Sequence, residues 1–208
     1  MDEAYVKDYL RSTLKFSQHS LDLLSIYVDE LLKYNKKYNL ISKSSENNIW
    51  GRHILDSAQL IKHISFNDNV YLLDLGSGAG FPGMVIAIYN QNPSFHVKLL
   101  EKSPVKCDFL SNIVRITDKD VKICKKNAKD IKFKYDIITA RAFRKIPYIL
   151  DISREIVNKN HQIIIMKGKN AQEDIDSALK THNFSYKLRN SVTEKKSKII
   201  IIENNKSE

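Results

Sequence analysis

The segment from Asp74 to Gly83, DLGSGAGFPG, constrains the fold of this chain more than any other part of its sequence. An apolar run at 70–75 leads into the glycines and predicts a buried strand, and the residues from Pro82 to Tyr89 predict a helix with proline at its favoured first position. Glycines at 76, 78 and 80 permit positive φ angles and let a ligand approach the backbone. This strand–loop–helix unit predicts an α/β fold with a ligand-binding loop, the alternative being a plain tight turn followed by an exposed acid.

Apolar patterns after this loop alternate between strand and helix. Strands are predicted at 70–75, 97–101, 121–124, 135–139, 162–166, 185–188 and 199–202, and helices at 82–89, 105–116, 146–157 and 171–181. Such alternation is typical of βαβ units in a mostly parallel sheet, here of seven strands. No helix separates the last two strands, so they are expected to form a hairpin at the sheet edge.

Residues 5–64 show helical spacing only, and Ser20 is a candidate cap for the second helix of this section. The period changes after residues 67–69, Asn-Asp-Asn. We therefore divide the chain into an N-terminal helical extension, 1–66, which packs on the catalytic core, and an α/β domain, 67–208.

The charge balance favours a polyanionic partner. The chain has 34 Lys and Arg against 24 Asp and Glu, a net charge of +10, and its 42% hydrophobic content excludes a disordered chain. Nucleic acid is one such partner and an anionic membrane is its rival. Two cysteines are too few for a disulfide framework or a CxxC metal site, and no signal sequence or long apolar span is present. A cytoplasmic protein without a metal, outside the membrane, is expected.

The glycine spacing is G-x-G-x-G. A dinucleotide fold has G-x-G-x-x-G, and Phe81 stands where the third glycine of that pattern would be. This tighter pattern after an acidic residue, Asp74, resembles motif I of S-adenosylmethionine (SAM) methyltransferases. Glu101 ends the next predicted strand, where a carboxylate can accept both hydroxyls of a ribose. Asp74, Gly76, Gly78, Gly80, Phe81 and Glu101 are therefore candidate cofactor-binding residues.

The acceptor side of the site contains cations. Arg141 and Phe143 follow the strand at 135–139, and Lys167 ends the next strand; there is no Asn-Pro-Pro-aromatic tetrad and no cysteine nucleophile near a proline. Such a site suits an acceptor with a free lone pair, such as guanine N7, which needs no deprotonation. Arg141 and Lys167 are expected to read guanine O6 and a nearby phosphate, or else to dock phosphate or pair with buried acids.

Four segments carry a more specific resemblance: WGRHILDS at 50–57, LDLGSGAGFPG at 73–83, RAF at 141–143 and KG at 167–168. Over roughly residues 20–190 the chain resembles the ribosomal RNA small subunit methyltransferase G family, also called glucose-inhibited division protein B. The resemblance implies a Rossmann-like class I fold and SAM-dependent methylation of guanine N7 in the 530 loop of 16S ribosomal RNA. The expected partner is that RNA or a small-subunit particle, and the expected state is a monomer.

The resemblance also implies site residues. Its cofactor contacts fall on Gly76, Phe81, Glu101, Lys102, Ser103, Ala128, Lys129 and Arg141. His53 joins Arg141 and Lys167 as a catalytic candidate if its helix packs over the glycine loop; otherwise it is an ordinary core histidine. The chain departs from the family's pattern at 127–130, Asn-Ala-Lys-Asp, and at Cys107, which replaces a basic residue. A backbone contact to adenine survives these changes, whereas a side-chain contact is not carried over.

Three further alternatives stay open. Arg52 and Asp56 have the spacing of an ordinary helical salt bridge. The lysines at 122, 125, 126, 129, 132 and 134, together with those at 195, 196 and 198, indicate either a solvated surface or a path for an RNA backbone. The two competing functions are a SAM-binding RNA-binding protein without catalysis and a small-molecule methyltransferase.

Overall fold

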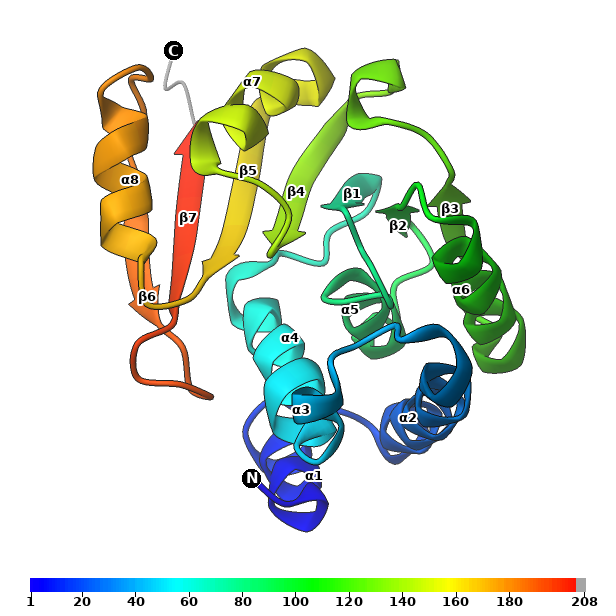
Figure 1. Ribbon diagram of the computed structural model, residues 1–208. Coiled ribbons are helices and arrows are strands. Elements are labelled where there is room, and N and C mark those ends of the chain that lie inside the picture. The colour runs from blue at the N-terminus through cyan, green and yellow to red at the C-terminus, as the bar shows by residue number, and fades with distance from the viewer. Residues whose placement is uncertain (205–208) are drawn as a thin grey trace.

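The computed structural model describes residues 1–204, and a seven-stranded sheet forms its centre (Figure 1). The strand order is β3-β2-β1-β4-β5-β7-β6, parallel from β3 to β5, with β7 antiparallel to both of its neighbours. The strands are β1 (Val70–Leu75), β2 (Phe95–Leu100), β3 (Val121–Cys124), β4 (Tyr135–Arg141), β5 (Val157–Lys167), β6 (Lys187–Asn190) and β7 (Lys198–Asn204). The α/β class, the mostly parallel sheet and the hairpin at its edge are thereby confirmed.

β5 exceeds its predicted range, 162–166, by more than any other strand does. β5 begins at Val157, a residue assigned to the preceding helix, and its first pair, Tyr135 with Val157, is followed by a register shift. Polar residues at 158–162 interrupt the apolar pattern there, so the apolar run starts only at Ile163.

Helices cover both faces of the sheet. They are α5 (Gly83–Tyr89), α6 (Pro104–Thr117), the 3-10 turn η3 (Ala128–Asp130), α7 (Ile146–Ile156) and α8 (Ala171–Leu179). Alternate residues of β5 divide between two cores: Ile164 belongs to the core shared with α5 and α6, whereas Ile163 and Ile165 belong to the core shared with α7 and α8. This two-sided burial explains the continuous apolar runs of the parallel strands.

The N-terminal section is helical, as predicted. It consists of α1 (Glu3–Ser12), α2 (Gln18–Tyr38), α3 (Lys43–Glu46), the π-helix η1 (Trp50–Leu55), α4 (Asp56–Ala58) and the 3-10 helix η2 (Gln59–His63). The cap of α2 is Ser17 and not Ser20: the Ser17 hydroxyl accepts a hydrogen bond from the Ser20 amide, while the Ser20 hydroxyl donates to the Ile88 carbonyl oxygen.

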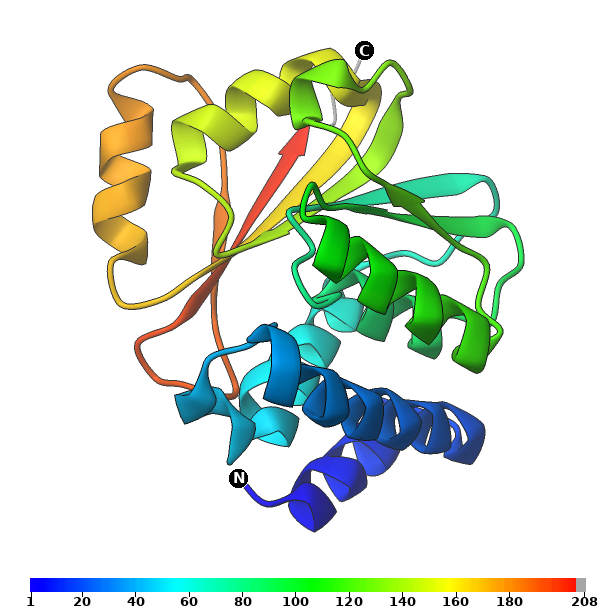
Figure 2. The same ribbon diagram turned by 45° about the vertical axis from the view of Figure 1, so that its right-hand side comes forward.

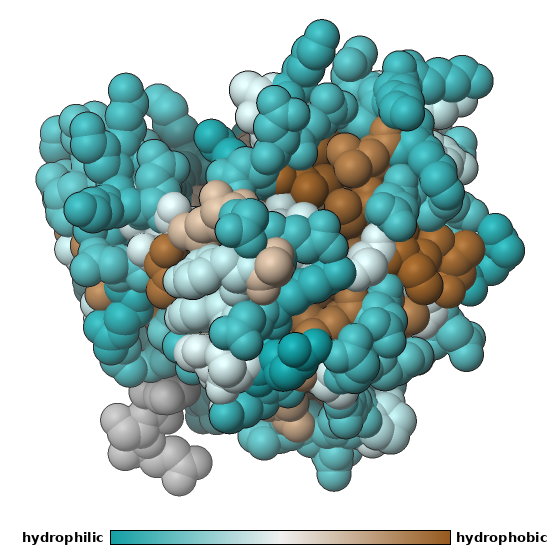
Figure 3. Space-filling model, turned by 90° about the horizontal axis from the view of Figure 1, so that it is seen from below, coloured by the Kyte–Doolittle hydropathy of each residue, from teal (hydrophilic) through white to brown (hydrophobic). Residues whose placement is uncertain are grey.

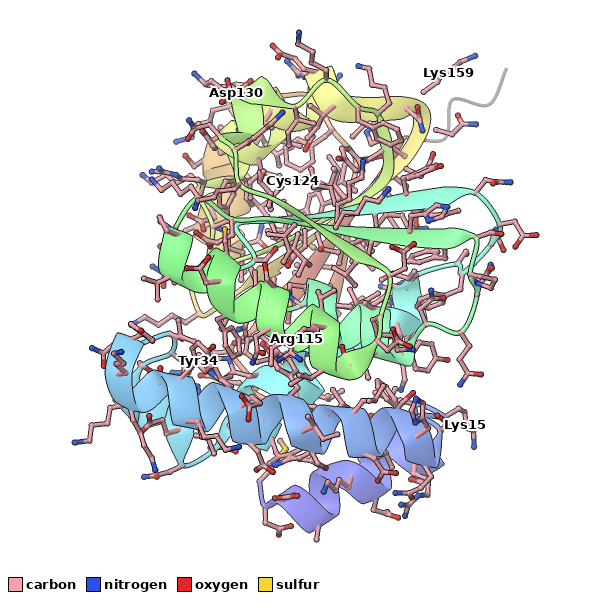
Figure 4. All side chains as sticks on the ribbon, turned by 90° about the vertical axis from the view of Figure 1, so that its right-hand side faces the viewer. Lys15, Tyr34, Arg115, Cys124, Asp130 and Lys159 are labelled. Carbon is pink, nitrogen blue, oxygen red and sulfur yellow. The ribbon has the colours of Figure 1, made fainter. Side chains whose placement is uncertain are left out.

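These helices form a layer beside the sheet, with α2 lying along α6 (Figures 2 and 4). Their buried residues, among them Leu24, Tyr27 and Ile54, share one hydrophobic core with Met84 of α5 and Phe109 of α6. From below, hydrophilic residues cover most of the face and hydrophobic residues gather in separate patches between them (Figure 3). The extension thus packs one side of its helices against the α/β part and leaves the other to solvent.

Candidate functional site

A cavity of about 530 Å³ lies at the carboxyl ends of β1, β4 and β5. The chain leaves β1 toward β2 on one side and continues through β4 and β5 on the other, so the cavity lies where the strand order reverses. In Figure 1 the arrowheads of β4 and β5 point down toward the N-terminal helices. Of the predicted site residues, those that line the cavity are His53, Gly76, Gly78, Phe81, Arg141 and Lys167.

The three glycines of the loop have different surroundings. All have positive φ angles, +69° at Gly76, +61° at Gly78 and +105° at Gly80. A β-carbon at Gly76 would collide with the Phe143 ring, and one at Gly80 would lie 2.6 Å from the Tyr27 hydroxyl oxygen. At Gly78 the nearest atom is 3.9 Å away. Gly78 is therefore open to a ligand, whereas Gly76 and Gly80 allow close packing.

Asp74 shapes the glycine loop from behind. Its side chain is buried, one oxygen accepts a hydrogen bond from the Gly83 amide at 3.1 Å, and the other accepts from the Thr139 hydroxyl at 2.9 Å. Burial raises the pKa of Asp74 to about 6, although its hydrogen bonds act in the opposite direction. Asp74 lies outside the cavity lining and ties the start of α5 to β1 and β4.

Glu101 joins the loop to the end of β2. One carboxylate oxygen accepts from the Gly78 amide at 3.0 Å, and the other accepts from the amides of Lys102 and Ser103, both at 2.8 Å. Only 8% of Glu101 is exposed. The carboxylate thus holds the backbone of Gly78, the one glycine among 76, 78 and 80 with room for a side chain.

The remaining cofactor candidates follow β2 and β3. Lys102 is exposed and Ser103 half-buried at the start of α6; Ala128 is buried and Lys129 exposed in η3. Cys107 is buried, and its thiol donates to the Glu101 carbonyl oxygen at 3.2 Å. Cys107 therefore supports the same turn from the core.

Arg141 connects the end of β4 to the π-helix η1. It donates to the His53 Nδ1 atom at 2.8 Å and to the Arg52 carbonyl oxygen at 3.0 Å, and lies 3.6 Å from Asp56. Its guanidinium is 5.0 Å from the centroid of the Phe81 ring. Asp56 therefore pairs with Arg141, and no Arg52–Asp56 salt bridge forms within residues 1–204.

His53 is neutral. Burial, followed by the charges of Arg141 and Arg52, lowers the pKa of His53 to about 3. Because arginine only donates, the His53 Nδ1 atom accepts and the proton is assigned to Nε2, which is buried without a hydrogen-bond partner in residues 1–204. The imidazole stacks on Phe81 with the ring centroids 4.8 Å apart. The structure thus brings His53, Phe81 and Arg141 together beside the glycine loop.

Lys167 lines the cavity with its ammonium group already engaged. The nitrogen lies 2.8 Å from the Asp174 carboxylate of α8 and donates to the Arg144 carbonyl oxygen at 3.0 Å. The sequence analysis left open whether Lys167 pairs with an acid. In the structure it pairs with Asp174, which is half-buried.

Two contacts of the site had no signal in the sequence analysis. The Tyr27 hydroxyl of α2 donates to the Ala79 carbonyl oxygen in the glycine loop. Asp56 also accepts from Gln59 at 2.9 Å and from Thr193 at 2.7 Å, which ties α4 to the loop between β6 and β7. The Tyr27–Ala79 and Asp56–Thr193 contacts join residues 52 and 137 positions apart, so local sequence patterns do not predict them.

Within residues 1–204, no helix is long and apolar enough to span a membrane, and no three His, Cys, Asp or Glu side chains gather in a way that could hold a metal ion.

Comparisons with known proteins agree with this arrangement. Residues 20–203 match the family described as rRNA small subunit methyltransferase G. The Ribosomal RNA small subunit methyltransferase G of Orientia tsutsugamushi (strain Ikeda) is 34% identical over 197 residues, which cover 95% of this chain and 97% of that protein. The protein of the same name from Rickettsia bellii (strain OSU 85-389) is 36% identical over 182 residues, covering 88% and 92%.

Solved structures show the fold. A SAM dependent methyltransferase from Aquifex aeolicus superposes with a TM-score of 0.62 at 13% identity, covering 82% of this chain and 97% of that one. A putative rRNA-methylase from Clostridium thermocellum gives a TM-score of 0.56 at 13% identity, covering 73% and 96%. The fold is therefore that of the class I SAM methyltransferases.

Proposed function

The chain belongs to the rRNA small subunit methyltransferase G family, and on that premise we propose that it transfers a methyl group from SAM to N7 of a guanine in the 530 loop of 16S ribosomal RNA. The observation that carries the proposal is a cation-lined cavity that opens directly onto the one unobstructed glycine of the loop, Gly78. RNA methylation is the family's activity; the N7 acceptor and its position in the RNA are the finer part of the proposal.

The glycine loop fits SAM because a ligand can reach the backbone at Gly78, where a side chain would occupy the same space. Glu101 holds this backbone and supplies the carboxylate for the ribose hydroxyls. The family resemblance assigns Lys102, Ser103 and the backbone of Ala128 and Lys129 to the adenosine, beyond the lining of the cavity. Bound SAM supplies an electrophilic methyl group.

The protein contributes orientation on the acceptor side. Guanine N7 has a free lone pair, so no group has to remove a proton before attack. Arg141, held by His53 and Asp56, presents a fixed donor surface to the base. Arg52, Lys106 and Lys198, which also line the cavity, favour a polyanionic substrate. The cavity excludes water once the base enters.

The helical extension, 1–66, completes this cavity in the proposal, since it supplies His53 and Asp56 and supports the glycine loop through Tyr27. We propose that the protein works as a monomer in the cytoplasm, on 16S RNA or a small-subunit particle, without a metal.

Transfer of radioactivity from tritium-labelled SAM tests the proposal. The protein is incubated with small subunits from cells that lack the modification, and the modified nucleotide is mapped by borohydride and aniline cleavage, which detects N7-methylguanosine. Cleavage within the 530 loop is expected. SAM binding without transfer to any ribosomal fraction would support a non-catalytic RNA-binding protein, and label in a small molecule would support the other alternative.

A further inference from the structure

The loop between β6 and β7, residues 191–197, forms one wall of the cavity. Ser191, Thr193, Glu194 and Ser197 line it. Figures 1 and 2 show this loop at the end of the hairpin, beside the N-terminal helices. A substrate bound in the cavity would therefore be close to this loop.

The base of the loop is held in place. The side-chain Oε1 atom of Gln59 accepts from the Val192 amide at 2.9 Å, and the Thr193 hydroxyl donates to Asp56 at 2.7 Å. Asp56 in turn pairs with Arg141. The position of the loop is thus tied to the same carboxylate that orients the cation of the site.

The tip of the loop carries two free cations. Lys195 and Lys196 are both exposed, and neither makes a salt bridge within residues 1–204. The adjacent acid, Glu194, instead accepts a long hydrogen bond from Ser197 at 3.4 Å. Neither lysine lines the cavity itself, but both lie between Glu194 and Ser197, which do. A held loop with unpaired lysines beside a cavity fits the phosphate backbone of a nucleic acid.

The other basic stretch, 122–134, lies elsewhere. β3 forms the edge of the sheet opposite to β6, and none of these lysines lines the cavity. In Figure 4 the segment at Asp130 lies at the far end of the molecule from α2. The two stretches therefore do not form one continuous surface around the cavity mouth.

We propose that the RNA backbone next to the target nucleotide docks on the tip of the β6–β7 loop, through Lys195 and Lys196, and not on residues 122–134. This inference rests on the proposed function for its choice of RNA as the polyanion. The anchors at Gln59 and Asp56 place those phosphates at a fixed distance from Arg141.

A matched pair of double variants tests the surface. K195Q/K196Q and K125Q/K126Q each neutralise two adjacent exposed lysines. Binding of a full-length 16S RNA transcript is measured by filter retention between 50 and 250 mM salt, and SAM binding by calorimetry verifies the fold. For K195Q/K196Q the log-log salt slope is expected to fall by about 1.4 to 1.8. K125Q/K126Q should keep the wild-type slope.

Thr193→Val separates the effect of the loop's position from the effect of its lysine charges. It removes the hydrogen bond to Asp56 and leaves every charge in place, so RNA affinity should fall about threefold to tenfold while the salt slope stays unchanged. An equal or larger slope change in K125Q/K126Q, or an unchanged slope in K195Q/K196Q, overturns the proposed surface.

Methyl transfer by the wild type is measured in a separate assay, which tests the proposed function independently of the RNA-binding surface. If the wild type binds RNA but transfers no label, the proposed function fails while the binding comparison still decides the surface. If the wild type binds no RNA, both fail.

Discussion

Gly78 and Gly80 share a left-handed backbone and differ in what a side chain would meet, so alanine substitutions separate ligand binding from packing. A left-handed alanine costs about 1 to 2 kcal/mol at either position. Gly78→Ala adds a β-carbon in open space; we expect a melting temperature only a few degrees below wild type and SAM affinity at least about tenfold weaker. Gly80→Ala places its β-carbon against Tyr27 and should destabilise the protein more. Wild-type SAM affinity in Gly78→Ala, measured by calorimetry, would refute the motif I assignment.

Asp74 should make stability depend on pH. Its pKa is raised from 3.8 to about 6 on folding, so the folded state favours the protonated acid. The resulting stabilisation is complete below about pH 4 and is lost as the pH rises through 6. Relative to Asp74→Asn, which does not titrate, the wild type should lose about 2 to 3 kcal/mol of unfolding free energy between pH 4 and 7.5. Urea unfolding across this range measures the difference, and a constant difference would contradict the raised pKa.

At the scale of elements, α2 supports the glycine loop through one hydroxyl. Tyr27→Phe leaves the Ala79 carbonyl oxygen without this donor, and a buried unsatisfied group costs about 1 to 3 kcal/mol. We expect this loss of stability together with weaker SAM binding. Tyr34→Phe is the control, because Tyr34 lies on the same helix (Figure 4) and its hydroxyl makes no hydrogen bond within residues 1–204. If both variants unfold at the same urea concentration, Tyr27 does not anchor the loop.

The elements that could be predicted are those with a strong local signal. The apolar run at 70–75 predicted the strand Val70–Leu75, and the glycines followed by Pro82 predicted the helix after them. The final hairpin was predicted because no helical pattern separates the last two strands. The helical spacing at 50–63 is instead realised as consecutive π, α and 3-10 segments, which contact Arg141 and the β6–β7 loop. Such tertiary contacts join residues that are far apart in the sequence and leave no periodic pattern of apolar residues.

The site shows the same limit at the scale of the whole molecule. The glycine motif predicted Gly78, and the ends of two predicted strands predicted Glu101 and Arg141. The structure places all three near the carboxyl edge of the sheet. The sequence could not show that Tyr27 leaves no room for a side chain at Gly80. Nor could it show that Asp56 contacts both Arg141 and Thr193. Both facts depend on the extension lying over the α/β part, which only the assembled chain shows.

The complete site also predicts how the reaction responds to pH. A general base works best when its pKa is near the working pH, and its loss typically costs about a hundredfold to ten-thousandfold in rate. With a pKa of about 3, His53 is neutral from pH 6.5 to 9 and is a weak base. At saturating RNA and SAM, His53→Ala should therefore keep a single-turnover rate within about tenfold of wild type, without a new pH dependence. What the variant loses is the acceptor for Arg141, so its defect should be one of orientation.

A substrate with 7-deazaguanine at the target position provides the chemical control, because it lacks the N7 lone pair and keeps the other edges of the base. We expect no methyl transfer to it by the wild type and unchanged binding of the RNA. Methylation of the deaza substrate would exclude N7 as the acceptor. A thousandfold loss in His53→Ala, combined with a wild-type rate that titrates near the ordinary histidine pKa of about 6.5, would mean that a base takes part, because orientation by a neutral imidazole produces no such titration.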